Sequence, residues 1–159
     1  MGVEINGGAE RRLAELGIVL PEPPEPAGMY RPVRRSGGLL YLSGQVPMGF
    51  PPDIPVIGKV GRDLTLEQAQ EAARLTALNL LAALRRELGD LDQVGGIVKL
   101  FGMVNCTPGF TRTPEVINGC SALLIEIFGE RGRHARSAIG VAELPFNMAV
   151  EIEMIAEIS

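Results

Sequence analysis

The sequence predicts an α+β fold, in which a layer of helices packs against one mixed β-sheet. Three patterns indicate this: an amphipathic helix within residues 65–89, an apolar run from Ile97 to Asn105, and an alternating strand from Ala149 to Ile158. The expected order of elements is β-β-α-β-α-β-β, with one further short strand allowed before the first of these helices. The chain has 159 residues, 46% of them hydrophobic, which suits one main globular domain.

Residues 1–27 are predicted to form an N-terminal appendage on a main domain that spans residues 28–159. Ala9–Leu16 is a short amphipathic stretch that Gly17 ends. The segment Pro21–Pro26 then reads P-E-P-P-E-P. Because proline fixes its own dihedral angle and lacks a backbone donor, we expect this segment to be an extended spacer.

Two short strands are expected next, followed by a long loop. The strand at Tyr30–Arg35 is weakened by Pro32, whereas Leu39–Ser43 is a clean apolar run bounded by glycines. The stretch Val46–Gly61 is rich in glycine and proline, so it is predicted to be a loop. Loops of this length in small domains often border a binding site.

The most strongly predicted element is a helix that follows Thr65. Thr65 and Gln68 have the spacing of a capping box, and Gly89 supplies a stop. Its apolar residues recur at helical spacing and form one wide face: Ala73, Ala77, Leu80, Leu81, Leu84 and Leu88.

The next elements alternate between sheet and helix. After a turn at Asp90–Gln93, the apolar run Ile97–Asn105 is predicted to be a buried strand. A loop at Thr107–Thr113 precedes a helix that should begin at Pro114, a residue favoured in the first helical turn, and run to about Phe128.

The last two strands are predicted at His134–Ala142 and Ala149–Ile158. In the final strand apolar residues alternate with Glu151, Glu153 and Glu157. Side chains of a strand point alternately to its two faces, so one face is apolar and the other carries carboxylates.

Composition excludes several classes of protein. The formal net charge of -4 and the pI of about 5.1 argue against a surface that coats nucleic acid. The two cysteines are too few for a disulfide framework and no secretion signal is recognised, so we expect reduced thiols and a cytoplasmic protein. No apolar run approaches the roughly 20 residues that span a bilayer.

Arg136 is an isolated charge in a stretch of small and apolar residues. Such a position is costly for arginine unless a negative group pairs with it, and the planar guanidinium fits a carboxylate through two parallel hydrogen bonds. A nearby glutamate, Glu151 or Glu153, would then manage protons or water beside the captured acid. The pattern suggests a site for a small carboxylic acid. The alternatives are a structural salt bridge for Arg136 and a merely solvated face for the glutamates.

Four short motifs, in order, resemble the RidA/YjgF family, formerly labelled L-PSP endoribonuclease or translation-initiation inhibitor. They are L-S-G-Q-V-P at Leu42–Pro47, A-R-S at Ala135–Ser137, L-P at Leu144–Pro145, and V-E-I-E-M-I-A at Val150–Ala156. The resemblance runs from about residue 28 to the end, and the appendage and long loop suggest a longer bacterial subgroup. It implies the chorismate-mutase-like (YjgF-like) fold, with two main helices on one face of a mixed sheet.

The resemblance also implies a function. Family members form homotrimers with ligand clefts between subunits, and their best-known reaction hydrolyses enamine or imine intermediates such as 2-aminoacrylate to a 2-keto acid and ammonia. No metal or organic cofactor takes part. In this chain Arg136 would clamp the substrate carboxylate, and Glu151 would position or activate the attacking water.

Further positions match the family with different strength. Ser43 and Gly44 fall on the S-G of its cleft-lining motif, whereas Tyr30 and Asn118 match looser positions. Ala138 stands where archetypal deaminases often carry cysteine or threonine, which places substrate preference in question.

Two other functions are weighed against the deaminase. A carboxylate-binding regulatory module would keep Arg136 without turnover. An endoribonuclease or translation inhibitor ranks last, because an acidic chain with few aromatic residues and one histidine offers little for RNA. We therefore expect a small imine or carboxylate as partner, and neither nucleic acid nor a membrane.

Overall fold

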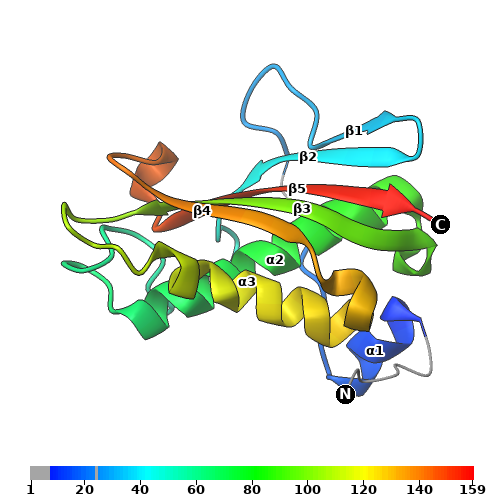
Figure 1. Ribbon diagram of the computed structural model, residues 1–159, viewed down its shortest axis with the longest axis horizontal. Coiled ribbons are helices and arrows are strands. Elements are labelled where there is room, and N and C mark those ends of the chain that lie inside the picture. Colours follow the sequence, from blue (N-terminus) through cyan, green and yellow to red (C-terminus); the bar gives the residue numbers. More distant parts are fainter. Residues whose placement is uncertain (1–7, 24) are drawn as a thin grey trace.

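A computed structural model describes residues 8–23 and 25–159. A single five-stranded sheet, in the order β1-β2-β5-β3-β4, lies against helices α2 and α3, as predicted for the α+β class (Figure 1). The bounds of the elements are α1 Ala9–Glu15, β1 Val33–Ser36, β2 Leu39–Gln45, α2 Leu66–Leu88, η1 Leu91–Gln93, β3 Val94–Asn105, α3 Thr113–Phe128, η2 Gly129–Gly132, β4 Ala135–Val141, η3 Pro145–Asn147 and β5 Val150–Ile158.

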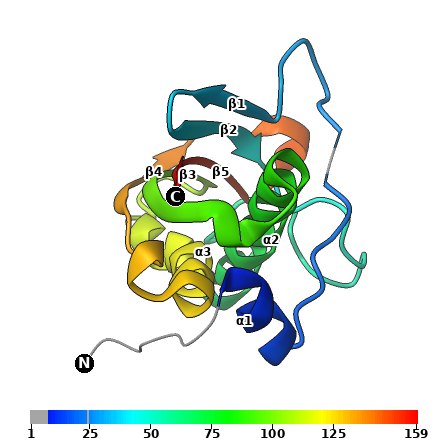
Figure 2. The ribbon, with the colours of Figure 1, turned by 90° about the vertical axis from the view of Figure 1, so that its right-hand side faces the viewer.

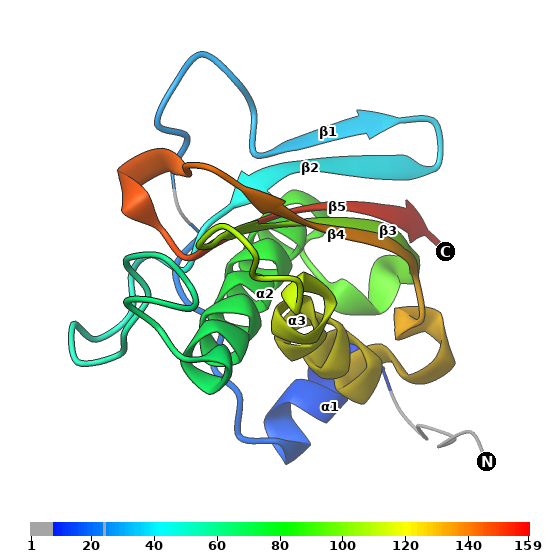
Figure 3. The ribbon, with the colours of Figure 1, turned by 60° about the vertical axis from the view of Figure 1, so that its left-hand side comes forward.

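The register of the sheet fixes which side chains share a face. Strands β1, β2, β5 and β3 pair antiparallel, and β4 lies parallel to β3 at one edge. Leu100 of β3 is opposite both Arg136 of β4 and Met154 of β5. Leu100 and Met154 are buried, so this set faces the helices. The α-helices α1, α2 and α3 all lie on this one side of the sheet, and none covers its other face (Figure 3).

Helix α2 forms as the sequence predicts. The Gln68 backbone N–H donates to Thr65 Oγ1 at 3.2 Å, and the Thr65 N–H donates to Gln68 Oε1 at 2.9 Å, which completes the capping box. Gly89 ends the helix with a left-handed φ of 81°. The apolar face is buried, and α2 packs against β2, β5 and α3.

Helix α3 begins at Thr113, one residue before the predicted start, with Pro114 in its first turn. It crosses α2 closely at Gly119, where a Cβ atom would lie 2.0 Å from the Gln70 backbone oxygen. Only glycine permits this approach, which brings the first half of α3 under β4.

The structure differs from the prediction at two strand starts, each by three residues, and at the optional strand. Strand β1 begins at Val33 instead of Tyr30, because Pro32 cannot donate to a sheet ladder. Strand β3 begins at Val94, three residues before the expected start, and its first residues pair irregularly with β5. The Val46–Gly61 loop contributes only isolated bridges, such as Ile57 to Met148, so the optional strand does not form.

The N-terminal segment lies along the helices before it reaches the sheet (Figure 2). In α1, Ala9 and Leu13 are buried, and the Glu10 carboxylate pairs with Arg85 of α2. The extended chain that follows is fastened to α2 where Glu25 Oε1 accepts from Arg86 at 2.7 Å. Residue 27 as a domain boundary stays a prediction. No helix in the described chain is both long and apolar enough to cross a bilayer.

Candidate functional site

A cleft of about 510 Å³ lies beside the second half of β2 and the start of β5. The N-terminal segment forms one wall and the turn at η3 forms another. Four predicted site residues, Tyr30, Ser43, Gly44 and Glu151, line this cleft. The remaining lining residues are Glu25, Pro26, Ala27, Gly28, Pro32, Gln45, Val46, Met48, Pro145, Phe146 and Glu153.

Gly44 makes room for the carboxylate of Glu151. A Cβ atom at Gly44 would lie 2.1 Å from Glu151 Oε1, so no larger residue fits without moving the glutamate. The register of β2 and β5 shifts between Leu42 and Gln45, where Gly44 lies. Such an irregularity re-aims side chains next to functional sites. Glu151 is therefore placed by the backbone of the S-G-Q motif.

The pKa of Glu151 lies above its ordinary value. Burial is the main cause because it disfavours the charged carboxylate, and the negative charge of Glu153 adds to the effect. A half-buried carboxylate with a raised pKa is a better base than an ordinary glutamate and is suited to holding and deprotonating water.

The hydroxyl of Ser43 is engaged within the protein. Ser43 Oγ donates to the Arg31 backbone oxygen at 2.6 Å, and the Ser43 N–H donates to the Pro32 oxygen at 2.9 Å. These bonds hold the segment that carries Tyr30 against β2. Ser43 thus shapes the cleft wall, and Tyr30, 48% exposed, lines that wall.

Asn79 is a cleft-supporting residue that the sequence reasoning missed. Its Nδ2 donates to the backbone oxygens of Val46 at 2.8 Å and Met48 at 3.0 Å, both in the cleft lining. The side chain is fully buried and its Oδ1 has no hydrogen-bond partner. The sequence feature that could have indicated Asn79 is its place as a polar residue within the apolar face of the helix that follows Thr65.

Arg136 is held from the helix side of the sheet. Its Nη1 donates to Asn118 Oδ1 and to Ser121 Oγ, each at 2.9 Å, and its Nη2 donates to the Pro114 backbone oxygen at 3.2 Å. These partners all belong to α3 and none is a carboxylate. The guanidinium is therefore oriented without being neutralised, as a clamp for an external carboxylate requires.

Ser121 joins Arg136 to the only histidine of the chain, and this link was also missed. Ser121 Oγ lies 3.0 Å from His134 Nε2, and His134 Nδ1 lies 2.7 Å from the Gly132 backbone oxygen. Burial lowers the pKa of His134, the positive charge of Arg136 lowers it further, and the Gly132 oxygen acts in the opposite direction. The sequence feature that could have indicated Ser121 is its three-residue spacing from Asn118, which places both on one face of the helix.

Ala138 lies on the same face of β4 as Arg136. Its backbone oxygen accepts from Thr113 Oγ1 at 3.1 Å, and its side chain packs against the core. This position offers an external ligand a small apolar surface beside Arg136 and no side-chain donor.

One chain does not bring Arg136 and Glu151 together. Arg136 is in register with Leu100, whereas Glu151 is in register with Met103. These two β3 residues are three apart, so Arg136 and Glu151 point to opposite faces of the sheet. The predicted site residues thus form two groups: Glu151, Gly44, Ser43 and Tyr30 around the cleft, and Arg136, Asn118 and Ala138 beside α3.

Within the described residues, no three metal-binding side chains cluster.

Gly44→Ala is expected to lower any activity that depends on Glu151 by at least about tenfold, since a shift of about 1 Å in a catalytic group has large kinetic effects. The new methyl group must push the Glu151 carboxylate away. Gly38→Ala is the matched control, because its Cβ meets nothing within 4 Å. Steady-state kinetics and thermal unfolding of both variants decide the matter. Full activity in Gly44→Ala would contradict the role given to Glu151.

The chain resembles known proteins over most of its length. The model of the family described as "YjgF/chorismate_mutase-like, putative endoribonuclease" matches residues 10–158. A curated relative, protein TCP17 of Trypanosoma cruzi, is 42% identical over 162 residues and covers 100% of this chain and 99% of its own. The 2-iminobutanoate/2-iminopropanoate deaminase of Dermatophagoides farinae is 32% identical over 89% of this chain and 94% of its own.

Solved structures agree with these matches. A protein of unknown function from Agrobacterium tumefaciens is 47% identical, with a TM-score of 0.86 over 95% of this chain and 92% of that chain. The chain is a member of the RidA/YjgF family and has its chorismate-mutase-like fold.

Proposed function

We propose that the protein hydrolyses reactive enamine or imine intermediates of the 2-aminoacrylate type to 2-keto acids and ammonia. The observation that carries this proposal is Glu151, a half-buried carboxylate with a raised pKa that Gly44 admits to an open cleft. The deaminase name of the mite relative supports the same reaction.

The chemistry needs positioning more than a strong catalyst. Arg136 binds the substrate carboxylate through its Nε–H and the second N–H of Nη2, because both hydrogens of Nη1 are donated to α3. Glu151 accepts a proton from water as the water oxygen adds to the imine carbon, and that proton passes to the nitrogen. The hydroxyl group of this intermediate then gives up its proton, which Glu151 passes to the nitrogen, so the C–N bond breaks, ammonia leaves and the carbonyl of the 2-keto acid forms.

Because the two residues face opposite sides of one sheet, the proposed site needs Arg136 from a second copy of the chain. The uncovered face of the sheet carries apolar side chains that suit such contact, with Tyr41 and Ile139 each 43% exposed. A closed ring of identical contacts would place three equivalent clefts between subunits. We accordingly propose a homotrimer, and sedimentation should give three times the chain mass.

An RNA substrate is less compatible with this cleft. Its lining carries three carboxylates, Glu25, Glu151 and Glu153, which repel a phosphate backbone. Of the arginines, none lines the cleft within the described chain.

The test of the proposed reaction is a coupled assay in which an amino-acid oxidase generates imines from several amino acids. Faster release of ammonia and keto acid than in buffer is the expected result. If no imine is hydrolysed faster than in buffer, the proposal that the protein is an imine-hydrolysing enzyme is wrong. Ligand-dependent thermal stabilisation without turnover would then indicate a carboxylate-binding module.

A further inference from the structure

The turn between β4 and β5 has an unusual backbone beside the cleft. Phe146 and Asn147 both adopt left-handed φ values, 56° and 54°, and are the only such residues other than glycine in the described chain. Asparagine tolerates this region, but for a bulky residue such as phenylalanine it is a strained outlier. Surrounding contacts must maintain this conformation.

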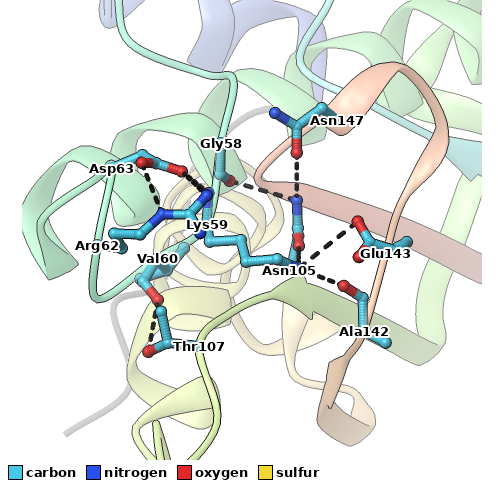
Figure 4. A network of polar contacts seen from close by, with 10 residues as sticks. All are labelled: Gly58, Lys59, Val60, Arg62, Asp63, Asn105, Thr107, Ala142, Glu143 and Asn147. Carbon is cyan, nitrogen blue, oxygen red and sulfur yellow. Dashed lines mark hydrogen bonds and ion pairs between the residues drawn. The ribbon is translucent and has the colours of Figure 1, made fainter.

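A polar network centred on the buried side chain of Asn105 maintains the turn (Figure 4). Fully buried Asn105 donates from Nδ2 to Asn147 Oδ1 at 3.1 Å, and Lys59 Nζ donates to Asn105 Oδ1 at 2.7 Å. The Asn147 backbone oxygen accepts from the Gly58 N–H at 2.8 Å. Lys59 also donates to the Ala142 backbone oxygen. The network thus ties the loop before α2 to the end of β3 and to the chain just before and within the turn.

The result of this arrangement is an exposed aromatic ring in the cleft lining. Phe146 is 64% exposed, although burying a phenylalanine side chain is normally favourable. Nearby in the lining are Met48, 42% exposed, and Pro145. A strained backbone that presents an apolar side chain to a cleft is typical of a binding function.

The size of the cleft points the same way. At about 510 Å³ it falls within the range of about 300–1,000 Å³ that holds drug-sized ligands. Ala138 beside Arg136 likewise adds no polar group to the proposed binding surface.

We infer that Phe146 is a specificity-determining residue, which receives the apolar side chain of an imine derived from a larger aliphatic or aromatic amino acid. This inference rests on the proposed function, whose Glu151 and Arg136 act on the carbon, nitrogen and carboxylate common to all such imines. Phe146 contacts only the variable group.

Charge in the cleft does not favour a cationic side chain instead. Glu25 is already paired with Arg86, and Glu151 is engaged with the attacking water in the proposed reaction. Of the three carboxylates in the lining, Glu153 then remains to attract a cation, and it is exposed to solvent. An acidic substrate side chain would be repelled by Glu153 and by ionised Glu151.

The kinetic test compares imines generated from leucine, alanine and lysine. Phe146→Ala is expected to lower kcat/KM for the leucine-derived imine by about tenfold, the usual effect of losing part of an apolar pocket, and for the alanine-derived imine by less than about twofold. Phe146→Leu should keep most of the preference. Val19→Ala, at a residue 88% exposed outside the cleft lining, is the control. Equal effects on both imines, or a wild-type preference for the lysine-derived imine, would overturn the inference.

A binding test separates this inference from the proposed function. Titration calorimetry with 4-methyl-2-oxopentanoate and pyruvate should show tighter binding of the former, and Phe146→Ala should remove the difference. If the wild type hydrolyses no imine, the proposed function is wrong. The tighter binding of 4-methyl-2-oxopentanoate than of pyruvate, and its loss in Phe146→Ala, then tests the inference by itself. If Phe146→Ala changes the sedimentation mass, the ring is a contact between copies and the inference is wrong.

Discussion

Arg136→Ala is expected to lower kcat/KM for imine hydrolysis by about 100-fold or more, because the substrate carboxylate loses both its charge partner and its orientation. Arg136→Lys should recover little, since lysine cannot form the two parallel bonds of a guanidinium. Arg133→Ala is the matched control, because Arg133 is exposed and its ion pair is with Glu130, three residues before it. Coupled kinetics and thermal unfolding of the three variants provide the measurement.

Mixing two inactive variants tests where Arg136 acts. An Arg136→Ala subunit supplies an intact Glu151, and a Glu151→Gln subunit supplies an intact Arg136. If each site takes one residue from each of two subunits, a randomly mixed trimer population should regain about one quarter of wild-type activity. If the variants co-assemble, as mass spectrometry would show, and no activity returns, the proposed site between subunits is wrong.

The sequence was sufficient for the elements, because their signals are local. The capping box at Thr65 and the alternation along β5 depend on neighbouring residues, and both elements formed as expected. The pairing order of the strands has no such local signal. It decides that Glu151 and Arg136 face opposite sides of the sheet, although they are only 15 positions apart in the sequence.

The missed residues act through backbone atoms or through distant side chains. Asn79 supports the cleft by bonding to backbone oxygens more than thirty residues earlier. Asn105 was predicted only as the end of a buried strand, yet its amide joins Lys59 to Asn147. A polar residue at a buried position signals that a partner exists, because burial without one is costly, but it does not say which partner.

Glu151→Gln is expected to lower kcat by about 100- to 10,000-fold, the usual contribution of a general base. The same change should not destabilise the protein. Because burial raises the pKa of Glu151, the ionised carboxylate opposes folding at every pH above that pKa, and glutamine removes this cost. We therefore expect a melting temperature at neutral pH equal to or above that of the wild type. The difference should shrink as the pH falls through the raised pKa, where Glu151 is protonated.

The pH dependence of activity tests the ionised form directly. With Glu151 as the base, kcat/KM should fall as the pH drops through its raised pKa. The negative charge of Glu153 contributes to the raised pKa of Glu151. Glu153→Gln should therefore lower this pKa and move the acid limb of the pH profile, the range in which kcat/KM falls, to lower pH. Glu157→Gln, further along the same strand and outside the cleft lining, should leave the limb in place. An acid limb that Glu153→Gln does not move would mean that another group controls the activity, and Glu151 would then only position water.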